Sequence, residues 1–158
     1  MKSILLAAAL LAAAACSSAP AATPSPTPTP SPSGPLLTLT MRGGLCAPGA
    51  CETSYYVEHD GRVHLAAKPP NELGYLVEQE LADLRAAIGA ADFDDIRSHA
   101  FAGTCPTAYD GQEMVLEFAT PAGTQQIASC EVAFDWNAPL FNAVAVALWP
   151  IVGPLVQP

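Results

Sequence analysis

The stretch Thr53-Ser-Tyr-Tyr-Val-Glu-His-Asp-Gly-Arg-Val-His-Leu65 decides the fold of this chain. Its first half is rich in Tyr and Val, residues that fit the half-buried, pleated surface of a strand. Asp60-Gly61 is a strong signal for a two-residue turn between paired strands. We therefore predict a β-hairpin whose strands are Thr53–His59 and Arg62–Leu65.

Alternation of apolar and polar side chains predicts more strands on both sides of this hairpin. Leu37–Arg42 alternates Leu, Leu and Met with Thr, Thr and Arg, and Met114–Phe118 shows the same period. Pro121-Ala-Gly123 is a turn signal, after which Gln125–Phe134 is expected to return as the last strand. The folded domain is expected to begin near Leu36.

Helices are predicted from a different apolar spacing. Apolar residues recur at helical intervals over Val77–Ile88, and Gly89 is the expected C-terminal stop. Asn137 and Pro139 predict the cap and first turn of a last helix, Leu140–Leu148.

The order of these elements gives the fold class. Pro69-Pro70-Asn71 is expected to end extended structure, and Asp92–Ile96 predicts a short helical turn. The order β-β-β-α-β-β-α, with connections of hairpin length, predicts an α+β fold with a small antiparallel sheet and helices on one face. The apolar segment Trp149–Pro158 contains three prolines and Gly153, so we expect it to pack across the edge of the domain.

The first 15 residues predict export. Lys2 supplies a positive n-region, and Ile4–Leu11 an apolar stretch too short for the roughly 20 residues of a membrane span. Leu11-Ala-Ala-Ala-Ala-Cys16 resembles a lipobox, which implies cleavage before Cys16 and acylation of its thiol with chains such as palmitate. The alternative is cleavage at Ala19-Pro-Ala21, which would give a secreted soluble protein.

Three parts of the chain follow from this interpretation: a lipoprotein signal peptide at 1–15, an acylated Cys16 with a tether at 16–35, and a single domain at 36–158. Ser17–Pro35 contains seven prolines among Ser, Thr and Ala and favours extended polyproline structure. We predict an extracytoplasmic location, anchored by lipid to the cell membrane or the outer membrane.

Cysteine usage supports export. Five cysteines less Cys16 leave Cys46, Cys51, Cys105 and Cys130, an even set that predicts two disulfides in an oxidising compartment. Four cysteines allow three pairings, of which short loop closure favours Cys46–Cys51 and Cys105–Cys130. A zinc set is the alternative interpretation, and export favours disulfides over it.

Charge limits the classes of partner. All 15 acidic residues lie at or after Glu52, and the formal net charge of the whole chain is −9. A strongly acidic domain argues against nucleic acid and against direct binding to an anionic lipid surface, so we expect contact with a membrane through the lipid anchor only.

Catalytic and metal-binding motifs are weak in this sequence. No nucleophile elbow, zinc-protease helix or phosphate-cradling glycine loop occurs, so we predict no enzyme and no cofactor. A two-residue hairpin turn would pair Val57 with His64 and His59 with Arg62, which places both imidazoles on one face. Two histidines without a third ligand are expected to be ordinary strand residues rather than a metal site.

The candidate binding site is the segment around Cys105. Phe101–Gln112 lacks apolar periodicity, and Cys105-Pro106 stiffens it, so we predict an exposed loop anchored by a disulfide. Loops of this kind concentrate binding function because their rigidity lowers the entropy lost on binding. The residues of the predicted protein-binding loop are Thr104, Pro106, Thr107, Ala108, Tyr109 and Asp110. The alternative is a structural loop whose cysteine staples two strands.

Two resemblances accompany these patterns. Gly44–Cys51, Tyr55-Tyr56, Asp60–Val63 and Leu81–Phe93 resemble a bacterial family of exported domains of unknown function, which implies a cysteine loop, a Tyr-bearing strand, a hairpin and a helix. Thr104–Asp110 with Ser129-Cys-Glu131 is similar to the subtilisin inhibitor family. That similarity implies a rigid extended reactive loop in which Thr107 is the P1 residue and Ala108 the P1′ residue.

Together these observations predict a cell-envelope lipoprotein that acts as a non-enzymatic protein-binding module. Inhibition of an extracytoplasmic serine protease is its most specific form. The alternative is a structural or accessory lipoprotein with no defined ligand, and an enzyme of unknown type comes third.

Overall fold

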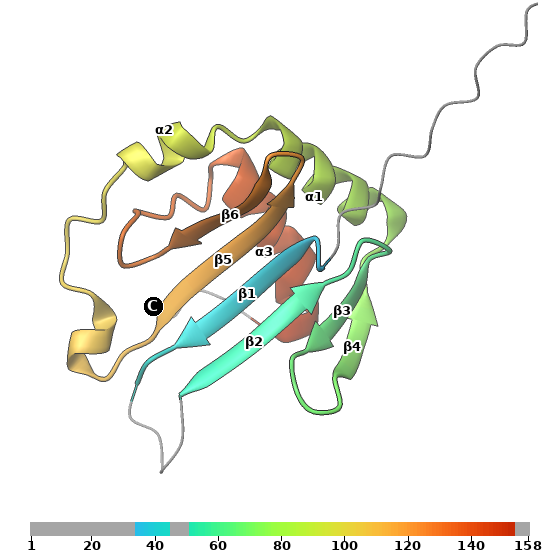
Figure 1. The fold of residues 1–158 in the computed structure, drawn as a ribbon, viewed down its shortest axis with the longest axis horizontal. Coiled ribbons are helices and arrows are strands. Elements are labelled where there is room, and N and C mark those ends of the chain that lie inside the picture. The colour runs from blue at the N-terminus through green and yellow to red at the C-terminus, as the bar shows by residue number, and fades with distance from the viewer. Residues whose placement is uncertain (1–33, 45–50, 154–158) are drawn as a thin grey trace, which may run out of the picture. The chain divides into compact units, whose positions relative to one another are not determined.

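The computed structural model describes residues 34–44 and 51–153, which belong to one compact unit of the chain. Six antiparallel strands form an open sheet in the spatial order β4-β3-β2-β1-β5-β6 (Figure 1). The strands are β1 (Leu37–Arg42), β2 (Glu52–Val57), β3 (Arg62–Leu65), β4 (Asn71–Tyr75), β5 (Glu113–Thr120) and β6 (Gly123–Ala128). The helices are α1 (Glu78–Ala90), α2 (Phe93–Ser98) and α3 (Pro139–Val152), with a 3-10 helix η1 (Pro106–Tyr109) before β5. The predicted α+β class is confirmed.

The sheet has an apolar face and a polar face. Leu37 and Leu39 of β1 are fully buried, and Leu37 pairs with Val57 of β2 on one side and with Phe118 of β5 on the other. Directly paired residues share a face, so this apolar layer crosses the centre of the sheet. The residues between them, such as Thr38, lie on the opposite face.

Helices α1 and α3 cover the apolar face, as predicted. They pack against each other, and in Figure 1 α3 lies behind the sheet. Their buried residues are Leu81, Leu84 and Ile88 in α1 and Leu140, Phe141, Val144, Ala145, Ala147 and Leu148 in α3. Burying each large apolar side chain contributes about 1.5–3 kcal/mol, so this interface accounts for much of the stability.

Strand β4 was not predicted. Pro69-Pro70-Asn71 was expected to end extended structure, but the chain turns there and Asn71–Tyr75 pairs with β3. The prolines precede the strand, where a missing N–H costs no ladder hydrogen bond. As an edge strand it is mostly exposed, which explains why its sequence lacks clear apolar alternation.

Two boundaries near the C-terminus also differ from the prediction. Strand β6 ends at Ala128 rather than Phe134, because the amides of Glu131 and Val132 both donate to the Ala128 carbonyl and turn the chain. Helix α3 continues through Pro150 to Val152 instead of ending at Leu148. The described part of the apolar C-terminal segment therefore packs as a helix.

The observed register of the β2–β3 hairpin differs by one residue from the predicted register. Val57 pairs with Val63, and His64 lies opposite Tyr56. The Glu58 amide donates to the Arg62 carbonyl, which leaves a three-residue loop closed by a glycine with φ +92°. Such a loop needs a left-handed third residue, a position that Gly61 fills, and it shifts the register by one. The prediction that His59 and His64 share a strand face was therefore wrong, because His59 lies in the loop.

Candidate functional site

The predicted loop is tied to the sheet by a disulfide. Cys105 is bonded to Cys130, with their Cα atoms 5.0 Å apart, so the segment before β5 is joined to the turn after β6. This pairing confirms the prediction and excludes a zinc set made of all four cysteines. Cys46 lies outside the described residues, so its pairing with Cys51 stays a prediction.

Within the loop the main chain folds into a tight turn. The Ala108 amide donates to the Cys105 carbonyl at 2.9 Å, and the Gly111 amide donates to the Pro106 carbonyl at 2.8 Å. Asp110 ends η1 with φ 61°, a left-handed conformation that Asp tolerates better than most residues. A Cβ at Gly111 would lie 2.7 Å from Pro106 Cβ, so only glycine fits there.

The loop also packs closely against the two glycines that follow β1. A Cβ at Gly43 would lie 2.6 Å from Thr107 Cγ2, and one at Gly44 would lie 3.2 Å from the Asp110 carbonyl oxygen. Both glycines have φ +94°, so each is required by its conformation as well as by the close approach. Thr107 therefore turns its methyl group toward β1, and its hydroxyl lies 3.0 Å from Cys105 Sγ.

An ion pair joins β1 to β5 next to this loop. Arg42, the last residue of β1, donates from Nε to Glu113 Oε2 of β5 at 2.7 Å. Glu113 is 7% exposed, and its hydrogen bond raises the pKa of Arg42. The pair lies on the polar face, next to the point where the loop enters β5.

These contacts fix the main chain of the loop but leave the side chain of Tyr109 exposed to solvent. Tyr109 is 77% exposed. Thr104, Pro106, Thr107, Ala108 and Asp110 are also exposed, as expected of a surface loop. The extended main chain implied by the resemblance to subtilisin inhibitors is not observed, because Pro106–Tyr109 forms a 3-10 helix. The arrangement offers an aromatic ring, a hydroxyl group and a carboxylate, which suit non-covalent recognition.

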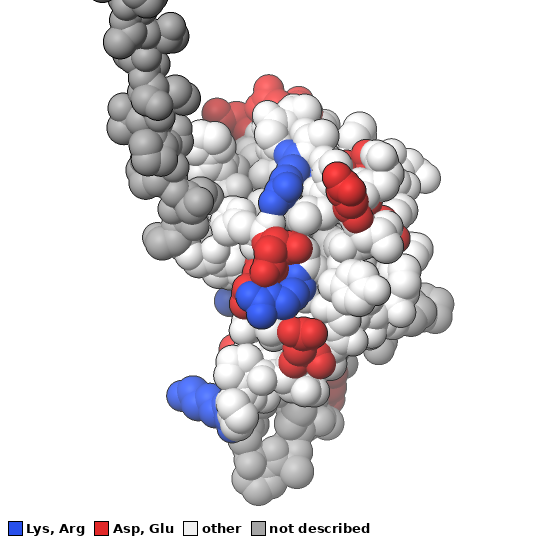
Figure 2. Space-filling view, turned by 90° about the vertical axis from the view of Figure 1, so that its right-hand side faces the viewer, with Lys and Arg blue, Asp and Glu red and all other residues white. Residues whose placement is uncertain are grey.

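A second polar cluster surrounds the β2–β3 loop, on the side of the domain shown in Figure 2, where acidic and basic side chains touch. Arg62 pairs with Glu58 and with Asp60, each at 2.9 Å. The Arg62 amide, followed by the guanidinium charge, lowers the pKa of Asp60. Arg62 bridges the two carboxylates and ties the loop together, which indicates a structural role.

His64 lies buried next to this cluster, and its burial was not predicted from the sequence. Its ring stacks on Tyr56 with centroids 4.9 Å apart, and Nε2 lies 3.4 Å from Glu58 Oε1. Neither ring nitrogen of His64 has a hydrogen-bond partner, and His59 Nε2 has none either. Among the described residues no group of three His, Cys, Asp or Glu side chains could hold a metal ion.

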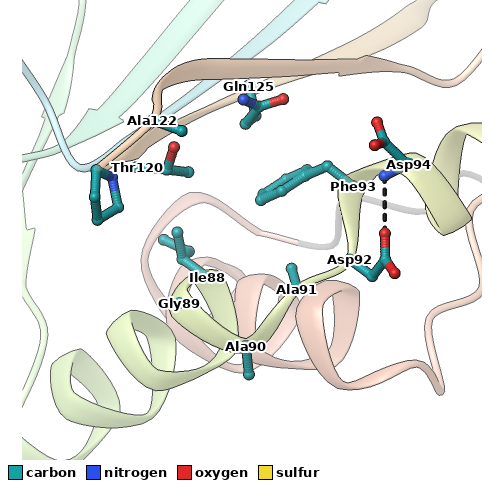
Figure 3. Close-up of a pocket in the computed structure, with 11 residues that line it drawn as sticks. Ile88, Gly89, Ala90, Ala91, Asp92, Phe93, Asp94, Thr120, Ala122 and Gln125 are labelled. Carbon is teal, nitrogen blue, oxygen red and sulfur yellow. Dashed lines mark hydrogen bonds between the residues drawn. The ribbon is translucent and has the colours of Figure 1, made fainter.

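Another hollow lies between α1, α2 and the β5–β6 turn. It has a volume of about 530 Å³, and Phe93 extends into it from the start of α2, between Ile88 and Thr120 (Figure 3). The carboxylate of Asp92, which lines the hollow, caps α2 by accepting hydrogen bonds from the amides of Asp94 and Asp95. We assign no ligand to this hollow.

The fold and the loop define a disulfide-braced α+β domain with an open six-stranded antiparallel sheet. No protein family, characterised protein or solved structure matches the chain in the comparisons made with each. In the described ranges 34–44 and 51–153, no helix is long and apolar enough to cross a membrane.

Proposed function

We propose that this domain is a non-enzymatic protein-binding module of an exported lipoprotein, and that it binds its partner through the loop Thr104–Asp110. The observation that carries the proposal is the exposure of Tyr109, at 77%, on a loop held by a disulfide and by close contacts with β1. Rigid loops lose little entropy on binding, and Tyr is enriched among the residues that dominate binding energy.

The anchor and tether belong to the same proposal. Acylation at Cys16 would hold the domain at the outer surface of a membrane, and Ser17–Pro35 would space it from that membrane. At about 3.1 Å per residue, an extended segment of this length reaches roughly 60 Å. The module could then meet partners within the cell envelope. Secretion without an anchor is the alternative.

Protease inhibition is one form of this function. The observed turn and the orientation of Thr107 toward Gly43 favour recognition through Tyr109 over insertion of Thr107 into a protease cleft. A structural or accessory lipoprotein with no ligand is the competing class.

The test is retention of envelope proteins from the native host by the immobilised full chain. Wild type is compared with Tyr109→Ala and with Tyr75→Ala, a matched control because Tyr75 is 72% exposed on the far edge strand β4. We expect a protein that wild type and Tyr75→Ala retain and Tyr109→Ala loses, with an affinity change of roughly 30-fold, or about 2 kcal/mol. Equal retention by all three chains, or by none, would contradict the proposal.

A further inference from the structure

A groove runs along the outer side of the helical layer, between α1 and α3. Two hollows of about 510 Å³ and about 260 Å³ form it, and they share Ala87, Ala90 and Pro139. The first lies beside Val146, and the second extends to Phe141 and the start of α2. The residues of α1 that line the groove run from Glu80 to Ala90, so the groove follows about 15 Å of this helix.

The floor of the groove is apolar and exposed. Small side chains on both helices keep it shallow and allow another backbone to approach closely; they are Ala86, Ala87, Ala90 and Ala143. Val146 stands at its side and is 52% exposed. Exposed apolar surface next to a hollow is typical of a docking site, because covering it removes that surface from water.

The rim carries negative charge on one side only. Its acidic residues are Glu80 and Asp83 of α1 with Asp92 and Asp95 at α2, whereas α3 contributes no charged residue. Their hydrogen bonds are to neutral groups, as for Asp83 with Gln79 and Glu80 with the Val77 amide, so the negative charges remain.

No basic side chain lines either hollow in the described part of the chain. The arginines of α1 and α2 are engaged elsewhere. Arg85 donates to the His59 carbonyl, and Arg97 pairs with Asp94 and Gln125. The negative charge of the rim is therefore not offset by any basic side chain that lines the groove, and a positively charged partner would be attracted to it.

We propose that this groove binds an amphipathic helix of a partner protein, with apolar residues on its inner face and Lys or Arg along the flank that lies over α1 and α2. A second copy would place acidic rim against acidic rim and is disfavoured by like charge. Ser17–Pro35 and Pro154–Pro158 contain no charged residue, so neither segment complements the rim. This surface is separate from the Cys105 loop and goes beyond its proposed function.

The experiment uses the full chain and a fluorescently labelled synthetic helix of about 15 residues, with Leu at i, i+3, i+4 and i+7 and Lys on the flanks. One control peptide has the same composition in scrambled order, and another has Glu in place of Lys. We expect anisotropy to show binding of the designed helix that is about ten-fold tighter than that of either control and weakens with added salt.

Variants of the protein locate the binding. Ala90→Trp fills the groove and Asp83→Lys reverses its charge, so each is expected to weaken binding by at least about ten-fold. Glu117→Lys, on the polar face of the sheet, is the matched charge control, and circular dichroism checks that every variant is folded. Tyr109→Ala should leave this affinity unchanged, which separates this proposal from the function of the loop.

Three outcomes would overturn the proposal: scrambled peptide that binds as tightly as the designed helix, Ala90→Trp and Asp83→Lys that keep full affinity, or self-association of the chain that Ala90→Trp abolishes. The last outcome would make the groove an interface between copies of this chain.

Discussion

Arg42 Nε lies 2.7 Å from Glu113 Oε2, and this ion pair joins the last residue of β1 to the first residue of β5. It stands where the loop from Cys105 enters the sheet, beside the contact of Thr107 with Gly43. One corner of the domain thus combines an ion pair, a disulfide and two conformationally required glycines. Since these contacts all fix one loop, each can be removed separately to measure its contribution.

The first prediction concerns this ion pair. Glu113→Gln removes the charge of a carboxylate that is 7% exposed and leaves Arg42 with a weaker acceptor. We expect a lower urea midpoint and faster proteolytic cleavage within residues 101–112, because the loop loses support. Glu117→Gln, in the same strand on the same face, is the control and should change neither measurement. Equal effects of the two substitutions would show that the pair does not position the loop.

The second prediction concerns the disulfides. Replacing Cys105 and Cys130 together by Ser opens a link between residues 25 apart and should lower the free energy of unfolding by about 3.5 kcal/mol, measured with urea. Peptide mapping without reductant should also find Cys46 bonded to Cys51. Four alkylatable cysteines in the mature domain would contradict both pairings.

Much of the fold follows from local patterns. The strands β1, β2, β3 and β5 and the helix α1 were predicted because apolar periodicity and turn residues agree in those segments. Strand β4 was missed because an edge strand with one neighbour needs no apolar alternation. The hairpin register was missed because Asp60-Gly61 fits a two-residue turn and a three-residue loop equally well, and the observed pairing of Val57 with Val63 and of Glu58 with Arg62 distinguishes them.

The candidate site was located from sequence, but its conformation was not. The disulfide and the exposure of the loop follow from Cys105 and the lack of apolar periodicity. The contact between Thr107 and Gly43 joins segments far apart in the chain, and a single sequence carries no signal for it. The groove between α1 and α3 was likewise hidden, since alanines on two helices reveal a shared surface only when the helices are packed.

A pH prediction follows from Asp60. Its pKa is lowered below the ordinary value of 3.8, chiefly by the Arg62 amide. A carboxyl group with a depressed folded pKa contributes stability that is present above its unfolded pKa and is lost as the pH falls through the folded pKa. Urea midpoints of wild type should therefore fall more steeply below pH 3.8 than those of Asp60→Asn. Parallel pH profiles would show that the carboxylate does not stabilise the loop.

Processing supplies a prediction about location. Mature protein from the native host is expected to begin at Cys16 and to carry acyl chains, as judged by intact mass and detergent partition. Cys16→Ser should move the protein from the membrane fraction to the soluble fraction, because a lipid chain contributes about 0.8 kcal/mol per buried methylene group. A mature N-terminus at Ala22, with the protein free in the medium, would establish secretion instead.

The last prediction separates the inhibitor form of the proposed function from recognition through Tyr109. If the loop acts as a standard-mechanism inhibitor, Thr107 fills the S1 pocket of the protease. Thr107→Met should then strengthen inhibition of subtilisin-like enzymes, since a buried apolar side chain gains about 1.5–3 kcal/mol.

The assay is residual activity of several serine proteases titrated with the full chain, with Tyr109→Ala as the matched variant. A standard-mechanism inhibitor needs a rigid loop, so reducing the Cys105–Cys130 disulfide should then weaken inhibition, because a loosened loop loses more entropy on binding. If wild type and Thr107→Met leave every protease active and the loop is simply cut, the inhibitor form fails. Binding of another protein through Tyr109 is tested separately, by the retention experiment with Tyr109→Ala.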